Sequence, residues 1–231
     1  NLTGESTYTG VTTVATGTLA VPSLANGGVA SPIGKSSNVA AKLILEGGTF
    51  QYTGASASTD RLFSLNGNAT LDSGSGALTF SNMGSLAVPV ASRTLTLTGS
   101  GAGILTPILP SYGSTGLVKS GTGTWTLDGL NTYTGTTTLN AGVLAVSNLA
   151  NANTAGGLGM GGTTAGYLVF NGGTLRYTGS ASVSVNRPFT LNATGGTLDA
   201  SGTGTVIWAG FGVTGMTLAS STGTYGLTLT G

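Results

Sequence analysis

The 231-residue chain has no histidine and no cysteine, and only seven Lys or Arg and six Asp or Glu residues. Without cysteine there is no disulfide framework, so pairing of strands and burial of apolar side chains must stabilise the fold. Without histidine the chain lacks the usual general base, the Ser-His triad and the commonest zinc ligand sets. These absences argue against most hydrolytic and metal-dependent enzymes.

Charge and apolar runs are also scarce. The formal net charge is +1, and the basic residues are scattered along the chain instead of clustered as a polyanion partner requires. No apolar run approaches the roughly 18 residues that cross a bilayer. We therefore expect no nucleic-acid partner and no membrane insertion by this segment. The chain starts at Asn1 with no signal peptide, so we expect a mature or excised piece of a longer protein.

The residues that are abundant favour strands and tight turns. The chain has 42 glycines and is 39% hydrophobic, and Thr, Ser, Asn and Gly supply its polarity. Disordered chains combine low hydrophobicity with high net charge, and this chain has neither. Threonine is β-branched, while Gly and Asn accept the backbone angles of tight corners. We expect a folded, all-β protein.

The sequence is internally duplicated. The segment "TYTGVTTVATGTLAVPSLANGG" from Thr7 matches "TYTGTTTLNAGVLAVSNLANAN" from Thr132, at an offset of 125. The offset grows to 126 at Arg61 and Arg187 and to 132 at the final matched glycines, Gly99 and Gly231. The offset grows because residues are inserted between short segments that stay alike, which is typical of stacked coils. We predict one continuous solenoid made of two repeat blocks, 1–125 and 126–231.

Alternation of apolar and polar residues predicts the strands. "TWTLDG" directs Trp125 and Leu127 to one side, and "TLTLTG" directs Leu95 and Leu97 to one side. Gly-Gly pairs mark corners in "LILEGGTFQY" and "LVFNGGTLRY", which predict strands on both sides of each corner. Such short strands also suit a sandwich or a barrel. The duplication favours a β-solenoid, with roughly 20 residues per coil and on the order of ten coils.

One stretch carries a family resemblance. "GLVKSGTGTWTLDGLNTYTGTTTLNAGVL", from Gly116 to Leu144, closely resembles the autotransporter-associated β-strand repeat, also called the passenger-associated transport repeat. A partial copy, "STYTGVTTVATGTLAV", occupies residues 6–21. The resemblance implies a right-handed parallel β-helix, a location outside a bacterium or on its surface, and a role in a passenger domain or large surface protein. It implies no catalytic residues.

The acidic residues are the candidates for a catalytic site. They are Glu5, Glu46, Asp60, Asp72, Asp128 and Asp199. Asp72 and Asp199 are equivalent in the two blocks, which predicts a turn or cap. Glu46 and Asp60, beside Arg61, could form a carboxylate pair on neighbouring coils, and the alternative is a solvated surface cluster. We predict no catalytic, cofactor-binding or metal-binding residues and no cofactor.

The aromatic and threonine residues are the candidates for ligand-binding sites. Trp125 alternates with Leu127, and Phe80 and Trp208 end matched segments, so a core position is expected for all three. Thr-x-Thr arrays occur in only some coils, which disfavours ice binding. Binding is instead expected in variable loops such as 82–93 or 103–115, and the proline-bearing segment 104–116 is predicted to be irregular.

These features predict a non-enzymatic, extracellular structural protein: a stalk, fibre or adhesin scaffold. Neither end resembles a capping coil, so we expect either continuation of a longer chain or self-association through the solenoid ends into filaments. A carbohydrate-binding or carbohydrate-active β-helix is the alternative, with surface glycans as partners. Clustered carboxylates in a groove would favour the enzyme.

Overall fold

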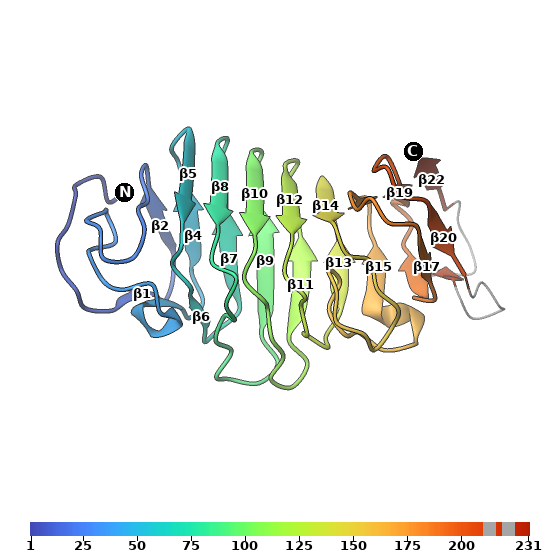
Figure 1. The fold of residues 1–231 in the computed structure, drawn as a ribbon, viewed down its shortest axis with the longest axis horizontal. Coiled ribbons are helices and arrows are strands. Elements are labelled where there is room, and N and C mark those ends of the chain that lie inside the picture. Colours follow the sequence, from blue (N-terminus) through green and yellow to red (C-terminus); the bar gives the residue numbers. More distant parts are fainter. Residues whose placement is uncertain (210–215, 219–224) are drawn as a thin grey trace.

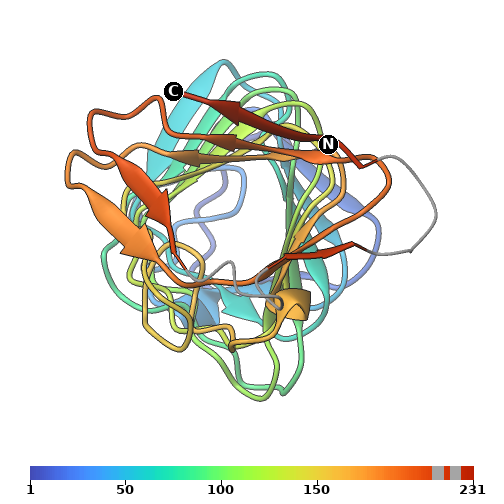
Figure 2. The same ribbon diagram turned by 90° about the vertical axis from the view of Figure 1, so that its right-hand side faces the viewer.

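The computed structural model describes residues 1–209, 216–218 and 225–231. These residues form an elongated stack of coils that advances along one axis from the N-terminus to the C-terminus (Figure 1). Every pairing between named strands is parallel. Viewed along the stack, successive coils wind around a common axis (Figure 2). The predicted parallel β-solenoid is confirmed.

Successive strands of a complete coil lie on three sides of the stack in a fixed order. These sides are here called face 1, face 2 and face 3. Within the described residues face 2 is a nine-stranded sheet, face 3 is an eight-stranded sheet, and face 1 has a three-stranded and a two-stranded sheet. The strands of face 1 are β1 (Thr12–Val14), β3 (Leu43–Leu45), β6 (Ser64–Leu65), β17 (Val183–Val185) and β20 (Val206–Trp208). Those of face 2 are β2 (Thr18–Val21), β4 (Thr49–Tyr52), β7 (Ala69–Asp72), β9 (Thr94–Thr98), β11 (Gly116–Lys119), β13 (Thr137–Leu139), β15 (Leu168–Phe170), β18 (Phe189–Leu191) and β21 (Met216–Leu218). Those of face 3 are β5 (Ser56–Thr59), β8 (Ala77–Phe80), β10 (Ala102–Leu105), β12 (Thr124–Leu127), β14 (Val143–Val146), β16 (Thr174–Tyr177), β19 (Gly196–Asp199) and β22 (Leu227–Thr230).

Face 1 is irregular in the middle of the stack. Single parallel bridges join Ser64 to Ala87 and Ser85 to Ile108 there. Two 3-10 turns, η1 (Ala40–Lys42) and η2 (Ala165–Tyr167), directly precede β3 and β15. Among the described residues, no helix has the length and apolar character needed to cross a membrane.

The core is a set of apolar ladders that run along the stack. The predicted inward residues Leu95, Leu97, Trp125 and Leu127 have at most 1% of their surface exposed. Threonines between them on the same strands face outward and are half-buried. Burial of each large apolar side chain contributes about 1.5–3 kcal/mol, so stacked coils stabilise one another.

A glycine in the core makes room for the largest side chain. Gly103 on β10 pairs with Trp125 on β12, and Leu144 on β14 is the next rung of the same ladder. A Cβ atom at Gly103 would lie 2.2 Å from Trp125 Cδ2, so the indole ring lies directly against the glycine backbone. Trp125 Nε1 donates a hydrogen bond to the Thr98 carbonyl at 2.8 Å, which satisfies its polar group inside the core.

The two sequence copies are displaced by one face. The segment that forms β1 on face 1 is matched by β13 on face 2, and the segment of β2 on face 2 is matched by β14 on face 3. The same shift relates β3 to β15, β4 to β16, β7 to β19 and β9 to β22. Since β13 lies five strands beyond β2 on face 2, the displacement is five turns plus one face. The block boundary drawn after residue 125 falls within β12.

The stack has one irregular segment that was predicted and two longer ones that were not. Segment 106–115 is irregular, as predicted for 104–116, but Ile104 and Leu105 still belong to β10. Two longer loops, 22–39 and 147–164, are the equivalent insertions of the two copies. Because of the one-face displacement, loop 22–39 replaces a strand of face 3, whereas loop 147–164 replaces a strand of face 1.

Candidate interaction surfaces

The two equivalent aspartates cap the turns that follow β7 and β19. Asp72 Oδ1 accepts a hydrogen bond from the Gly74 N–H at 2.7 Å, and Asp199 Oδ1 accepts one from the Ser201 N–H at 2.9 Å. A carboxylate that binds the N–H group two residues ahead closes an Asx turn. The predicted structural role of this repeated position is confirmed.

Each capping aspartate also binds the preceding coil. Gln51 Nε2 donates to Asp72 Oδ2 at 2.9 Å, and at the equivalent place Arg176 Nε donates to Asp199 Oδ2 at 2.6 Å. Burial alone would raise the pKa of Asp199, but hydrogen bonds from Ser201 and Arg176 outweigh it and lower the pKa to about 2. Asp199 therefore stays ionised over the physiological range.

The structure does not bring Glu46 and Asp60 together. Glu46 is exposed in the corner between β3 on face 1 and β4 on face 2, whereas Asp60 lies in the corner that follows β5 on face 3. Asp60 Oδ1 accepts from the Gly27 N–H at 2.7 Å, and its Oδ2 accepts from Asn38 Nδ2 at 2.9 Å. The carboxylate of Asp60 is thus occupied in holding loop 22–39.

Arg61 is not part of a solvated surface cluster either. Arg61 and its equivalent Arg187 are only 2% and 4% exposed. Arg61 donates to the carbonyls of Ala25, Asn26, Val29 and Gly34 and to Ser36 Oγ. Arg187 donates to the carbonyls of Ala150, Asn151, Thr154, Leu158 and Gly159. Burial lowers the pKa of both guanidinium groups, but arginine remains charged, and the carbonyl dipoles of the enclosed loop stabilise that charge.

A pair of hydrogen bonds between side-chain oxygens and backbone N–H groups closes the base of each long loop, 22–39 and 147–164. The Asp60 N–H donates to Asn26 Oδ1 while the Gly27 N–H donates to Asp60 Oδ1. In the same way the Asn186 N–H donates to Asn151 Oδ1 while the Ala152 N–H donates to Asn186 Oδ1. The two long loops are therefore anchored at their base and at their centre. Sequence reasoning missed this role, although the repeated arginine in "RLFSLN" and "RPFTLN" was a visible signal.

Lys119, a residue of the transport-repeat motif, lies inside the core. It pairs with Leu97 on one side and Leu139 on the other, in a ladder of apolar side chains on face 2. Its Nζ donates to the carbonyls of Ser120, Gly121 and Ala141 at 2.6, 2.9 and 3.2 Å. Burial lowers the pKa of Lys119 to about 8. The lysine joins two successive corners and leaves no charge at the surface.

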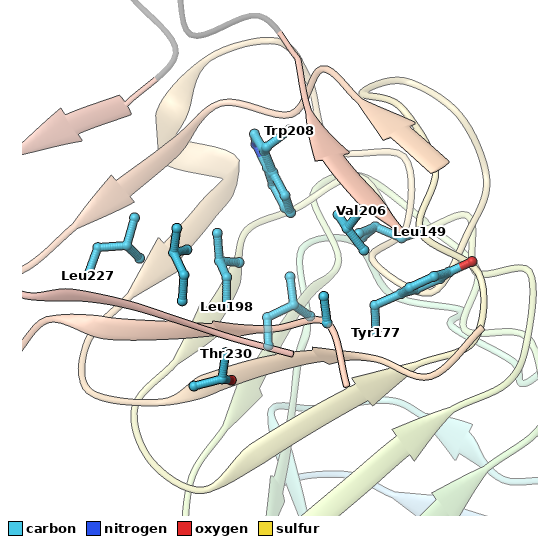
Figure 3. Close-up of a pocket in the computed structure, with 10 residues that line it drawn as sticks. Leu149, Tyr177, Leu198, Val206, Trp208, Leu227 and Thr230 are labelled. Atoms are coloured by element: carbon cyan, nitrogen blue, oxygen red, sulfur yellow. The ribbon is translucent and has the colours of Figure 1, made fainter. Parts of the chain in front are cut away.

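The C-terminal end of the stack has an open apolar pocket of about 370 Å³. In Figure 3, Trp208 from β20, Leu198 from β19 and Leu227 from β22 lie around one space. Leu229 pairs with Leu198 in the same ladder but is 72% exposed. Trp208 is half-buried and donates from Nε1 to the Arg187 carbonyl at 2.6 Å. Core side chains thus meet solvent here, and Trp208 packs against the buried core but is only partly buried, unlike Phe80 and Trp125, which are fully buried as predicted.

No cluster suited to a metal ion is found in residues 1–209, 216–218 and 225–231, where no three Asp or Glu residues gather. The C-terminal pocket is lined by no carboxylate.

Comparison with known proteins identifies relatives of this arrangement. The passenger-associated-transport-repeat family matches residues 1–21 and 117–146. The chain is 41% identical over 208 residues to the "Adhesin BmaC autotransporter" of Brucella suis biovar 1 (strain 1330). That match covers 89% of this chain but only 5% of the length of the relative. No solved structure matches the chain.

Proposed function

Because the chain carries passenger-associated transport repeats, as its sequence predicted, and has its place outside the bacterium or on its surface, we propose that it is a rigid, non-enzymatic segment of an autotransporter-like adhesin. In this role the solenoid holds its loops at a fixed distance from the cell. The adhesive activity named for the relative belongs to a much longer protein, and its extension to this chain is part of the proposal.

The observation that carries the proposal is the continuity of the stack. The ladder of face 2 contains Phe50, Leu71, Leu97, Lys119, Leu139, Phe170 and Leu191. Each strand pairs with the coil before it and the coil after it, and the anchored loops leave this pairing intact. A solenoid whose repeats all contact their neighbours resists bending and offers few unpaired segments to proteases.

Surface display tests the proposal directly. Antibodies raised against the purified chain should stain intact cells of the source bacterium as strongly as permeabilised cells. Brief protease treatment of intact cells should remove the staining. Staining that requires permeabilisation would contradict the proposed location and role.

We further propose that another β-solenoid coil of the same kind covers the C-terminal pocket. Leu229 and the partly exposed Leu227 and Trp208 form an apolar end surface, and β22 presents an unpaired strand edge within the described residues. Such an edge and such a surface are completed by one more coil of parallel strands. This coil can come from the same polypeptide or from a second copy in a filament.

Electron microscopy at micromolar concentration distinguishes these cases. If copies stack, the chain forms filaments, and Leu229→Glu shortens them to single rods because it places a charge in the apolar end surface. Met83→Glu is the matched control, because Met83 is 82% exposed in a loop away from the ends. Single rods from the unsubstituted chain would contradict end-to-end self-assembly.

The enzymatic alternative has little support in the geometry. A glycosidase needs two carboxyl groups about 5–10 Å apart in a groove. Neither the C-terminal pocket nor a hollow on face 2, which is described below, is lined by Asp or Glu. The hollow on face 2 instead has the character of a binding site.

A further inference from the structure

We infer that a hollow on the outer surface of face 2 binds neutral saccharides. This hollow, here called the hydroxyl groove, has a volume of about 530 Å³ and lies over β9, β11 and β13 beside η2. Its side chains include Thr94, Ser114, Thr136, Thr138, Thr164 and Tyr167. The inference rests on the proposed function, because a chain displayed at the cell surface meets glycans of its surroundings.

The floor of the groove exists because a side chain is missing. Leu117 points into the core, so its neighbour Gly116 occupies an outward position on β11, paired with Thr94 on β9. A Cβ atom at Gly116 would lie 3.1 Å from the Thr136 carbonyl oxygen and 3.8 Å from Thr94 Oγ1. Any larger side chain would fill this space.

The chemistry of the walls suits a ligand with many hydroxyl groups. In the described part of the chain, the hydroxyls of Thr94, Ser114, Thr138 and Thr164 make no hydrogen bond to protein. A hydroxyl both donates and accepts, as the hydroxyl groups of a sugar do. No charged side chain lines the groove. A uronate or sulfated sugar would call for Arg or Lys, so the groove favours neutral sugars.

Tyr167 supplies an aromatic wall that is held in place. Its side chain is 37% exposed, and a Cβ atom at Gly162 would lie 2.7 Å from Tyr167 Cε2, so the ring packs against a glycine backbone. Thr136 Oγ1 donates to the Gly166 carbonyl at 3.1 Å, and Thr190 Oγ1 donates to the Ala165 carbonyl at 3.1 Å. These bonds fix η2 from the coil before it and the coil after it. A fixed ring face suits the C–H groups of a pyranose ring and limits the entropy lost on binding.

The groove is not a by-product of the repeat. At the offset of 125, the first copy has Lys42 where the second has Tyr167, and Val11 where the second has Thr136. Lys42 Nζ donates instead to the Thr9 carbonyl at 3.2 Å. The fold therefore tolerates other residues at these two positions, and only the second copy combines the aromatic ring with the hydroxyl groups.

Saturation-transfer NMR with the purified chain tests the inference. The probes are gluco-, galacto- and manno-tetraoses, with tetragalacturonate as the charged comparison. We expect at least one neutral tetraose to bind with millimolar affinity. Tyr167→Ala should weaken that binding about tenfold, and Thr138→Val about fivefold, by loss of the aromatic contact and of one hydrogen bond. Tyr167→Phe should retain most of it.

Tyr112→Ala is the matched control, because Tyr112 is 57% exposed and does not line the groove. Circular dichroism of each variant shows whether the fold is intact, and the conservative Thr138→Val keeps the test valid if Tyr167→Ala unfolds. No binding of any neutral tetraose up to about 10 mM, equal loss with Tyr112→Ala, or preference for tetragalacturonate would overturn the inference. Surface staining of intact cells without sugar binding would overturn this inference alone and leave the scaffold function standing.

Discussion

Substitution of Gly103 by alanine tests the packing of the core at its tightest point. The added Cβ would lie 2.2 Å from Trp125 Cδ2 and 2.4 Å from Cε2 and Cε3. Carbon atoms in contact normally stay about 3.5–4.0 Å apart, so one of the two strands must move by more than about 1 Å. Trp125 has no exposed surface and is held by its hydrogen bond to Thr98. Overpacking costs about 1–3 kcal/mol and sometimes more, and we expect about 3 kcal/mol here.

A double-mutant cycle isolates this contact. Trp125→Leu alone should cost about 2–3 kcal/mol, because it leaves a cavity and removes the donor to the Thr98 carbonyl. With the indole gone, alanine at 103 has room, so Gly103→Ala should cost less than about 1 kcal/mol in the Trp125→Leu background. The coupling between the two sites is then about 2 kcal/mol and favourable.

Urea unfolding followed by far-UV circular dichroism measures these differences without relying on tryptophan fluorescence. Gly10→Ala is the control, because nothing lies within 4 Å of a Cβ at Gly10, and it should change stability by less than about 0.5 kcal/mol. An equal cost of Gly103→Ala in the presence and absence of Trp125 would refute the packing argument.

Three further predictions concern the buried charges. Arg187→Lys should destabilise the fold by about 3–5 kcal/mol and speed amide hydrogen exchange in loop 147–164, because lysine cannot reach five carbonyls; unchanged exchange would contradict the anchoring role. The pKa of Asp199 is about 2 in the folded state against 3.8 as its ordinary value, so its stabilising effect is complete above about pH 5 and is lost as the pH falls through 2. In thermal melts at pH 7, Arg176→Met should lower the free energy of unfolding by about 1 kcal/mol, which is less than the full effect of the Asp199 shift because solvent screens the half-exposed arginine. A variant that loses stability in acid as steeply as the parent would disprove the role of Arg176. The pKa of Lys119 is about 8 against 10.5, so between these values the unfolded chain binds the extra proton and the free energy of unfolding rises with pH, by at most about 1.4 kcal/mol per unit. Urea titrations from pH 7 to 9.5 should show this rise in the parent and lose it in Lys119→Met.

Strand positions and the repeat were accessible from sequence because both depend on local patterns. Alternation identified the inward faces of β9 and β12, and the equivalence of Asp72 with Asp199 identified a cap. Alternation also indicates an inward position for Lys119, because it follows inward-facing Leu117 by two residues. A charged side chain is nevertheless normally expected at the surface.

The remaining features depend on contacts between residues far apart in the chain. Arg61 donates to carbonyl groups 27 to 36 residues earlier in the chain, and the residues next to Arg61 give no sign of these partners. Glu46 and Asp60 are separated because they lie at different corners of a coil, and these corners point in different directions. The sequence does not show at which corner a residue lies, because it does not fix the number of residues in each coil. The hydroxyl groove likewise combines Thr94, Gly116, Thr138 and Tyr167 from four segments.

The displacement of the two copies by one face bears on how such a protein lengthens during evolution. A duplicated gene segment need not encode whole turns, because a strand with its corner fits any of the three sides. Duplication of such a segment would keep the parallel stacking and place the copied insertions on a new side, as loops 22–39 and 147–164 lie on different sides of this stack. Repeated events would distribute these insertions in a spiral around the rod. A rod of this kind would present its loops to all sides of its long axis.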